Sequence, residues 1–357
     1  MRHFILGALV LAGAAGSVEA AVPRPRVEVT FVLDTTGSMS GLIEGAKRKI
    51  WSIAERIGDG RPRPELRIAL VGYRDVGDQY VTLVHDFTSD MDLVFERLSA
   101  FRAEGGGDTP EHVSRALSDA VHRVSWSQGP ALRTIFLVGD APPHMDYQDG
   151  FDYRRHAREA VQRGIAVEAI ECGGDPETAR VWTEIASLAQ GHFARIDSNG
   201  GMPARVTPAD AELARLNGEL ARTVVSYGSR AEQATVSRKI EGRMAMAAPA
   251  AAEAASYFAK ADRLAEKDLV TLPEAEQKKL LADAPNAPAQ LKNKTTEEQV
   301  AYLRQQKDRR DKVQAQILDL QKQREAYLKK AETKPDGFDE QVMQALKERA
   351  AAVGIKY

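Results

Sequence analysis

Oxygen-bearing side chains recur at every second position in one short run near the start of the chain: Asp34, Thr36 and Ser38. Two further polar stretches, Asp108-Thr109-Pro110-Glu111 and Gly139-Asp140, come later in the sequence. Carboxylate and hydroxyl oxygens are the ligands that hard cations such as Mg²⁺, Mn²⁺ and Ca²⁺ prefer. The pattern therefore predicts one divalent-metal site. Zn²⁺ matches less well, because no cysteine or paired histidine accompanies these oxygens.

The elements that must position these residues alternate between β-rich runs and helical patterns from residue 26 to about 198. Strands are expected at 27–33, 66–73, 80–87, 134–138, 165–172 and 192–196, and helices at 42–57, 90–101, 110–124, 153–163 and 176–189. Apolar strands separated by amphipathic helices indicate an α/β fold with a mostly parallel, doubly wound, Rossmann-like sheet covered on both faces. The second and third strands are close enough to form a hairpin. Pro110 is expected to be the first residue of its helix.

Ligands of such sheets bind at the carboxyl ends of the strands. Asp34 ends the first predicted strand, Asp140 follows the apolar strand 134–138, and Thr109 lies in a glycine-rich loop before a helix. The topology is therefore expected to bring these three residues to one edge of the sheet.

The same residues resemble a known family. Asp34-x-Thr36-x-Ser38, the later Gly-Gly-Asp108-Thr109 loop and Val138-Gly139-Asp140 are similar to the von Willebrand factor type A domain and its metal-ion-dependent adhesion site, over about residues 26–200. The resemblance implies that Asp34, Thr36, Ser38, Thr109 and Asp140 bind the metal, some of them through water. The family often has serine where this chain has Thr36, but the hydroxyl is retained. It also implies an open coordination position that a carboxylate of a partner protein fills.

Beyond residue 203 the chain is rich in Ala, Glu, Lys, Arg and Gln, so residues 204–357 are expected to form a helical, coiled-coil-like region after a first domain at 24–203. Thr207-Pro208 is typical of a helix cap and first turn. The alanine-rich stretch 244–256 contains Pro249 and fits either a kinked helix or a flexible break. Residues 281–288 contain two prolines and are expected to form a loop.

Thr295 and Glu298 have the spacing of a capping box at the start of a long helix. Lys307 and Arg310 interrupt the apolar stripe of that helix. A helical hairpin or small bundle therefore fits better than a long regular coiled coil. Phe338, Val342 and Leu346 predict a last short helix.

The first twenty residues have the pattern of a secretory signal peptide. Phe4 to Gly16 is apolar, and Val18-Glu19-Ala20 offers small residues at a cleavage site. The apolar run is shorter than the ~20 residues a membrane-spanning helix needs, although an uncleaved anchor stays open as an alternative. The pattern predicts a periplasmic or secreted protein with no integral membrane span after cleavage. The single cysteine, Cys172, lies in an apolar strand and is expected to be buried.

The formal net charge of −2 gives no general attraction to nucleic acid. Asp75 fits either an acid that orients the metal ligands or a plain turn residue, and Glu111 an acid at a helix start. His144 fits the rim of the site or, more simply, a solvent-exposed loop. The favoured function is a metal-dependent, non-enzymatic binding module for an acidic group on a partner protein. A cell-envelope assembly protein acting through its helical tail is the alternative, and a metal-dependent hydrolase is less favoured because no clear base is present.

Overall fold

The computed structural model describes residues 24–201, 206–261, 263–282, 287–330 and 337–357, so the predicted signal peptide and residues 283–286 of the predicted loop 281–288 lie outside the described residues. Residues 281–282 of that predicted loop belong to a helix instead. The strands are β1 (Arg26–Asp34), β2 (Glu65–Tyr73), β3 (Thr82–Thr88), β4 (Leu132–Gly139), β5 (Ala166–Cys172) and β6 (Phe193–Ile196). The helices associated with them are α1 (Ser40–Gly58), α2 (Met91–Ala100), α3 (Val113–His122), α4 (Tyr153–Gln162), α5 (Pro176–Leu188) and the distant α11 (Gly337–Ala350). The short 3₁₀ turn η1 (Gly37–Met39) joins β1 to α1.

The six strands form one sheet in the order β3-β2-β1-β4-β5-β6. All neighbouring pairs are parallel except β2 and β3, which form the antiparallel hairpin that the short connection predicted. The central strand β1 is buried along nearly its whole length, as expected for a parallel strand that is covered on both faces. Cys172 is buried at the end of β5, as expected. The predicted mostly parallel, doubly wound α/β fold is confirmed.

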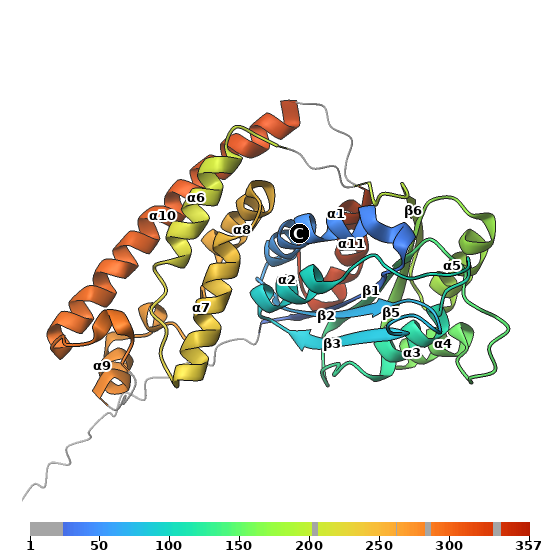
Figure 1. Ribbon diagram of the computed structural model, residues 1–357, viewed down its shortest axis with the longest axis horizontal. Coiled ribbons are helices and arrows are strands. Elements are labelled where there is room, and N and C mark those ends of the chain that lie inside the picture. Colours follow the sequence, from blue (N-terminus) through green and yellow to red (C-terminus); the bar gives the residue numbers. More distant parts are fainter. Residues whose placement is uncertain (1–23, 202–205, 262, 283–286, 331–336) are drawn as a thin grey trace, which may run out of the picture.

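Helices cover both faces of this sheet (Figure 1). One hydrophobic cluster joins the Val29 and Phe31 face of β1 to α1, α2 and α11. A second cluster joins Val32 and the opposite face to α3, α4 and α5. Because successive strand residues point to opposite faces, the alternate residues of β1 divide between the two clusters.

Pro110 does not begin a helix, so that prediction is wrong. The helix α3 starts three residues later, after His112, whose ring accepts a hydrogen bond from the Arg115 amide at 3.4 Å. The backbone before it is engaged elsewhere, because the Glu111 amide donates to the Pro142 carbonyl at 3.0 Å. This pairing with the loop after β4 holds the residues ahead of α3 out of helical conformation.

The helical region contains α6 (Asp210–Ala221), α7 (Arg230–Met244), α8 (Ala248–Lys260), α9 (Glu274–Ala282) and α10 (Thr296–Lys330), with the 3₁₀ turns η2 (Leu269–Thr271) and η3 (Ala289–Leu291). In Figure 1 the long α10 runs beside α6, and both also contact α8. Together they make the small bundle that the interrupted stripe favoured. None of the helices in the described ranges combines the length and apolar character needed to cross a bilayer.

Local signals in this region had mixed outcomes. The Thr295 amide donates to the Glu298 carboxylate at 2.8 Å and the Glu298 amide donates to the Thr295 hydroxyl at 3.3 Å, so the capping box is confirmed. Pro249 neither kinks a helix nor marks a flexible break, because α7 ends before it and it lies in the first turn of α8. Thr207 bonds to Asp210, but α6 begins only at that aspartate.

Arginines that interrupt the apolar pattern of α10 are buried and paired with acids of the bundle. Arg310 lies 2.7 Å from Asp268, and Arg324 donates to Asp210 at 2.8 Å. Only 5% of Arg310 is exposed. The polar residue in the stripe therefore faces the inside of the bundle, where an opposite charge compensates it.

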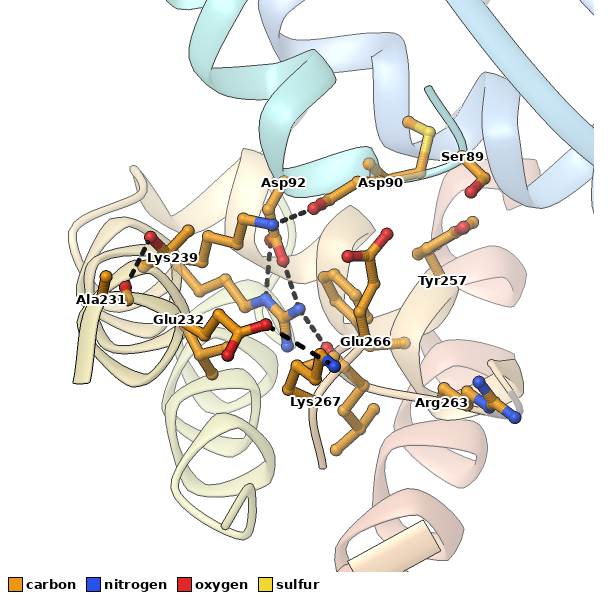
Figure 2. A pocket seen from close by; sticks show the side chains of 17 residues that line it. Ser89, Asp90, Asp92, Ala231, Glu232, Lys239, Tyr257, Arg263, Glu266 and Lys267 are labelled. Carbon is orange, nitrogen blue, oxygen red and sulfur yellow. Dashed lines mark hydrogen bonds and ion pairs between the residues drawn. The ribbon is translucent and has the colours of Figure 1, made fainter. Parts of the chain in front are cut away.

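The bundle packs on the α/β part through α8 and α1. The Trp51 ring of α1 lies 5.1 Å from the Phe258 ring of α8. Beside this contact α7 reaches α2, where Lys239 pairs with Asp90 and Arg243 with Asp92. A cleft of about 540 Å³ opens at this junction (Figure 2), and these two ion pairs line it.

The last helix leaves the bundle and returns to the sheet. In α11, Phe338, Val342 and Leu346 are buried, as their spacing predicted, against α1 and the β1 face of the sheet. The 3₁₀ turn η4 (Ala351–Val353) follows α11, and the Lys356 amide then donates to the Arg61 carbonyl at 2.9 Å. The C-terminal residues are thereby fastened to the end of α1.

Candidate metal centre

Asp34 is the last residue of β1 and is fully buried. Its Oδ1 accepts two hydrogen bonds from Thr36, one from the amide at 2.8 Å and one from the hydroxyl at 2.6 Å. The Thr36 hydroxyl in turn lies 3.3 Å from the Ser38 hydroxyl. The alternate spacing thus gathers three oxygen-bearing side chains on one side of the turn between β1 and α1.

Asp140 follows β4, which pairs in parallel with β1, so the carboxyl ends of the two strands are neighbours. Burial raises the pKa of Asp140, and a hydrogen bond from the Ser38 hydroxyl partly opposes that rise. Burial also raises the pKa of Asp34 to about 7, with the Asp140 charge adding to the rise and the Thr36 hydrogen bonds opposing it. Two neighbouring carboxylates at a buried strand edge repel each other unless a proton or a cation lies between them.

A divalent cation fits this arrangement because a buried ligand atom is left over. Asp34 Oδ2 is buried and has no hydrogen-bond partner among the described residues. A buried polar atom without a partner is costly, and a bound cation would remove both that cost and the repulsion from Asp140. The donors are carboxylate and hydroxyl oxygens, which suit Mg²⁺, Mn²⁺ or Ca²⁺.

Thr109 is less closely engaged than the other predicted ligands. Its loop is fixed beside Thr36 by two backbone bonds, from the Gly37 amide to the Gly105 carbonyl at 3.2 Å and from the Glu104 amide to the Thr35 carbonyl at 3.1 Å. The Thr109 side chain itself is exposed, and within the described ranges no hydrogen bond joins it to the other four. The structure therefore links Asp34, Thr36, Ser38 and Asp140 and leaves Thr109 in the adjacent loop.

Arg74 holds together the loop after β1 and the loop after α2. Its Nε donates to the Thr35 carbonyl at 3.2 Å, and its Nη2 donates to the Arg102 carbonyl at 2.8 Å. Its guanidinium lies 4.5 Å from the centre of the Tyr80 ring. Two backbone segments and one aromatic ring are thus in contact with the Arg74 cation at the strand edge.

Gly139 permits the close approach of β1, β2 and β4 at the site. A Cβ added there would lie 2.3 Å from the Tyr73 hydroxyl and 3.1 Å from the Asp34 Cβ. The first contact is shorter than real Cβ contacts, and the second is tight. A side chain at position 139 would therefore displace Tyr73 and crowd Asp34.

Glu111, which the sequence analysis interpreted as an acid at a helix start, is buried at this site. Only 3% of it is exposed, and its Oε2 is buried with no hydrogen-bond partner among the described residues. Burial, together with the charges of Asp34 and Asp75, raises the pKa of Glu111 to about 9. The sequence placed Glu111 at a helix start because it could not indicate the pairing that withholds this segment from α3.

Asp75 and His144 also lie at this edge of the sheet. Only 8% of the His144 side chain is exposed, so its simpler interpretation as a solvent-exposed loop residue is wrong. The His144 Nε2 lies 3.3 Å from the Asp75 carboxylate. The two residues form a second polar group beside the predicted metal ligands. The charges of Asp34 and Asp75 both raise the pKa of Glu111, which lies near both groups.

Comparison with known sequences identifies the region that carries this site. Residues 28–151 match the von Willebrand factor A domain family. Von Willebrand factor A domain-containing protein 7 of Rattus norvegicus is 37% identical over 119 residues, which are 33% of this chain and 12% of the relative. A putative ariadne-like RING finger protein of Acanthamoeba polyphaga mimivirus is 28% identical over 139 residues, or 39% of this chain and 12% of the relative. The chain thus spans about an eighth of the length of these relatives.

Two solved structures are each similar to 48% of the chain. The SpRpn10 VWA domain covers 48% of this chain and 89% of its own, with a TM-score of 0.37 and 14% identity. The conserved hypothetical protein BatB from Bacteroides thetaiotaomicron covers 48% of this chain and 90% of its own, with a TM-score of 0.37 and 18% identity.

Proposed function

We propose that this chain, which contains a von Willebrand factor A domain, binds a partner protein through a divalent cation held at the carboxyl edge of its sheet. Von Willebrand factor A domains are protein-interaction modules, and the further step is the metal-dependent mechanism. Asp34, Thr36, Ser38, Asp140 and the nearby Thr109 would hold the ion, with Mg²⁺ as the first choice and Mn²⁺ or Ca²⁺ as alternatives. A carboxylate of the partner would complete the coordination.

The observation that carries this proposal is the state of Asp34. Its carboxyl group is fully buried beside Asp140, one oxygen is organised by Thr36, and the other oxygen has no hydrogen-bond partner in the described chain. A structural aspartate would normally use both oxygens in hydrogen bonds. The unpaired oxygen supports a role as a metal ligand.

The partner chemistry follows from the donor set. Three of the five proposed ligands are neutral hydroxyl groups, and Ser38 and Thr109 are exposed. A hard cation held at an exposed edge by few charges favours an additional anionic oxygen. An aspartate or glutamate side chain of a second protein provides that oxygen, which is why an acidic group is the proposed target.

The location of the protein is also a proposal. The signal-peptide pattern of residues 1–20 supports export to the periplasm or the medium. N-terminal sequencing of the protein recovered from a cell-envelope fraction tests it, and a mature chain beginning near Ala21 is expected.

Calorimetric titration with Mg²⁺ tests the metal site first. The wild type should bind the ion, and Asp34→Ala should lose binding, whereas the control Asp319→Ala, an exposed aspartate on α10, should not. Capture from the envelope fraction, with Mg²⁺ and then with EDTA, then identifies a partner. A purified partner that binds Asp34→Ala as tightly as the wild type would show that the proposed mechanism is wrong.

A further inference from the structure

We infer that this domain has a second metal-binding site, formed by Asp75, Asp108 and His144. The three residues come from different loops at the carboxyl edge of the sheet, after β2, before α3 and after β4. The His144 Nε2 lies 3.3 Å from an Asp75 oxygen and 3.7 Å from an Asp108 oxygen. One ligand atom from each residue lies within 4.8 Å of the other two.

The hydrogen bonding of His144 leaves the correct nitrogen free for a metal. Its Nδ1 lies 2.9 Å from the Asp146 carboxylate. Because a carboxylate accepts hydrogen bonds, the ring proton is expected on Nδ1, and Nε2 then carries a lone pair. A histidine whose other nitrogen donates to a carboxylate is the usual arrangement around protein-bound metals. The Tyr147 ring stacks on His144 with centroids 4.1 Å apart and fixes its orientation.

Two buried polar atoms at this position have no hydrogen-bond partner among the described residues, Asp75 Oδ1 and His144 Nε2. Only 6% of Asp75 is exposed, and its Oδ2 already accepts a hydrogen bond from the Tyr147 hydroxyl at 2.6 Å. Although Nε2 faces two carboxylates, neither contact has the geometry of a hydrogen bond. Ligands bound at ~2.1 Å to one ion lie about 3–3.5 Å apart, and the His144 Nε2 lies 3.3 Å from Asp75 Oδ2, the oxygen that also accepts from Tyr147.

The backbone holds the ligands in place without the ion. The His144 amide donates to the Glu111 carbonyl at 3.2 Å, and the Glu111 amide donates to the Pro142 carbonyl at 3.0 Å. These bonds join the loop that carries His144 to the loop that carries Asp108. The Asp108 side chain is 62% exposed, so the site opens to solvent on that side and water can complete the coordination.

The donor set determines the class of ion. One imidazole nitrogen and two carboxylates suit Zn²⁺ or Mn²⁺ better than Mg²⁺ or Ca²⁺, which prefer oxygen alone. The site proposed for Asp34 and Asp140 has only oxygen donors, so the two sites differ in chemistry. The second site does not depend on the first.

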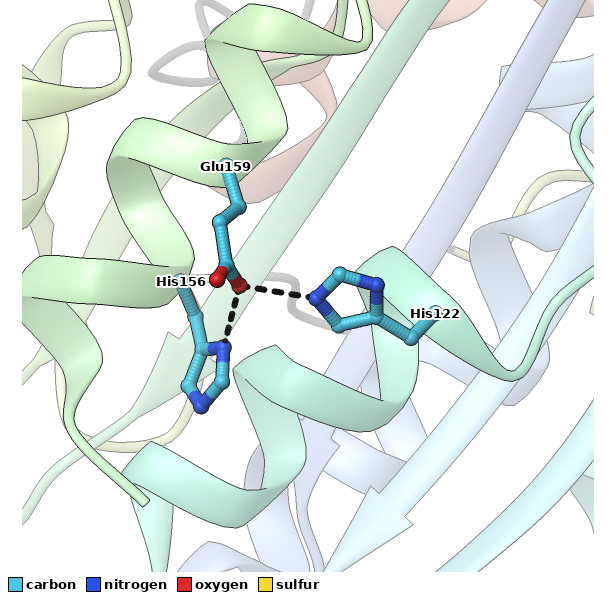
Figure 3. Close-up of side chains that lie close together, drawn as sticks. All are labelled: His122, His156 and Glu159. Atoms are coloured by element: carbon cyan, nitrogen blue, oxygen red, sulfur yellow. Dashed lines mark hydrogen bonds and ion pairs between the residues drawn. The ribbon is translucent and has the colours of Figure 1, made fainter. Parts of the chain in front are cut away.

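A second histidine cluster differs from this site, because both ring nitrogens of each histidine have hydrogen-bond partners. His122, His156 and Glu159 lie together on α3 and α4 (Figure 3), and one ring nitrogen of each histidine lies 2.8 Å from the same Glu159 oxygen. Arg163 donates to the other nitrogen of His122 at 3.1 Å, and Arg155 donates to that of His156 at 3.2 Å. If the nitrogens near Glu159 bound a metal, the other nitrogen of each ring would have to carry the proton. That nitrogen already accepts a hydrogen bond from an arginine, so it cannot also be protonated. This cluster is therefore a hydrogen-bond network and serves as the control.

The test uses Mn²⁺ with the full-length, tag-free protein, and pulsed EPR to detect ¹⁴N coupled to the bound ion. The wild type should show a histidine ¹⁴N coupling, which the oxygen-only site cannot produce. His144→Gln should lose the coupling and weaken Mn²⁺ binding at that site at least tenfold. His122→Gln should keep both. Asp34→Ala should also keep the coupling, which separates this inference from the proposed function.

Asp75→Asn is the second variant, because it keeps the size of the side chain and the Tyr147 contact while removing the charge. It should lose most of the ¹⁴N coupling, and it carries the test if His144→Gln does not fold. Wild-type protein without ¹⁴N coupling would overturn the inference and leave His144 as a histidine paired with Asp75, Asp108 and Asp146. A coupling retained in either folded variant would overturn it equally.

Discussion

The Phe338 ring lies 5.9 Å from the Phe31 ring, although one belongs to the last helix and the other to the first strand. Both side chains are 2% exposed, and Phe31 also stacks on Phe136 of β4 at 5.6 Å. The C-terminal helix α11 is therefore part of the core on one face of the sheet. The helix that covers this face follows all the helices of the bundle in the sequence.

Phe338→Ala is expected to destabilise the protein by about 3–5 kcal/mol, because it leaves a cavity between α11 and the sheet. Urea denaturation followed by tryptophan fluorescence measures the change. The control is Tyr327→Ala, whose side chain is 49% exposed on α10, and it should change stability by less than about 0.5 kcal/mol. Equal stability of the two variants would mean that α11 does not pack on Phe31 in solution.

The sequence predicted which residues lie at the strand ends better than it predicted which surfaces the helices pack against. Asp34 and Asp140 could be placed at one edge because each follows an apolar run and parallel strands share an edge. The stripe of Phe338, Val342 and Leu346 predicts a buried face but carries no information on its partner. The return of α11 to Phe31 therefore depends on tertiary packing that no local pattern encodes.

The candidate site shows the same division. Thr36 and Ser38 are close to Asp34 in the chain, so spacing alone brings their oxygens together. Backbone bonds to Glu111 hold the loop that carries His144, and they join residues distant in sequence. Pro110 failed to begin a helix for the same reason, since a general preference of proline was outweighed by backbone bonds to the loop after β4.

Arg310→Met is expected to destabilise the bundle by about 3–5 kcal/mol, because it leaves the Asp268 charge buried without its counterion. Arg310 lies 2.7 Å from Asp268 and also donates to the Thr223 hydroxyl at 3.0 Å. The measurement is the free energy of unfolding from urea titration. Arg309→Met removes a neighbouring exposed charge and should have little effect. If both variants unfold at the same urea concentration as the wild type, the buried pair does not contribute.

Glu253 predicts a pH dependence of stability. It is 6% exposed on α8, and burial raises its pKa to about 7, although Lys49 at 3.6 Å and Arg324 at 3.8 Å oppose the rise. The folded state therefore binds this proton more tightly than the unfolded state, whose pKa is the ordinary 4.5. The contribution of Glu253 to stability is fully present below about pH 4.5 and falls as the pH rises to about 7.

Thermal unfolding of the wild type and Glu253→Gln, in EDTA at pH 5 and at pH 8, measures this contribution. Other titrating groups are common to both proteins, so the difference in Tm between them isolates Glu253. The variant should gain relative to the wild type between pH 5 and pH 8. A difference that is constant over this range, or that moves in the opposite direction, would show that the ion pairs with Lys49 and Arg324 outweigh burial.

Gly139→Ala is expected to weaken Mg²⁺ binding and to destabilise the domain by about 1–3 kcal/mol, because the new Cβ would lie 2.3 Å from the Tyr73 hydroxyl and close to Asp34. Adding Tyr73→Phe removes the nearest oxygen, so the double variant should recover part of the stability. A double-mutant cycle from urea titrations gives the coupling between the two positions. Gly174→Ala is the control, since a Cβ there meets no atom within 4 Å. Additive effects of Gly139→Ala and Tyr73→Phe would contradict the close approach of the Tyr73 hydroxyl to Gly139.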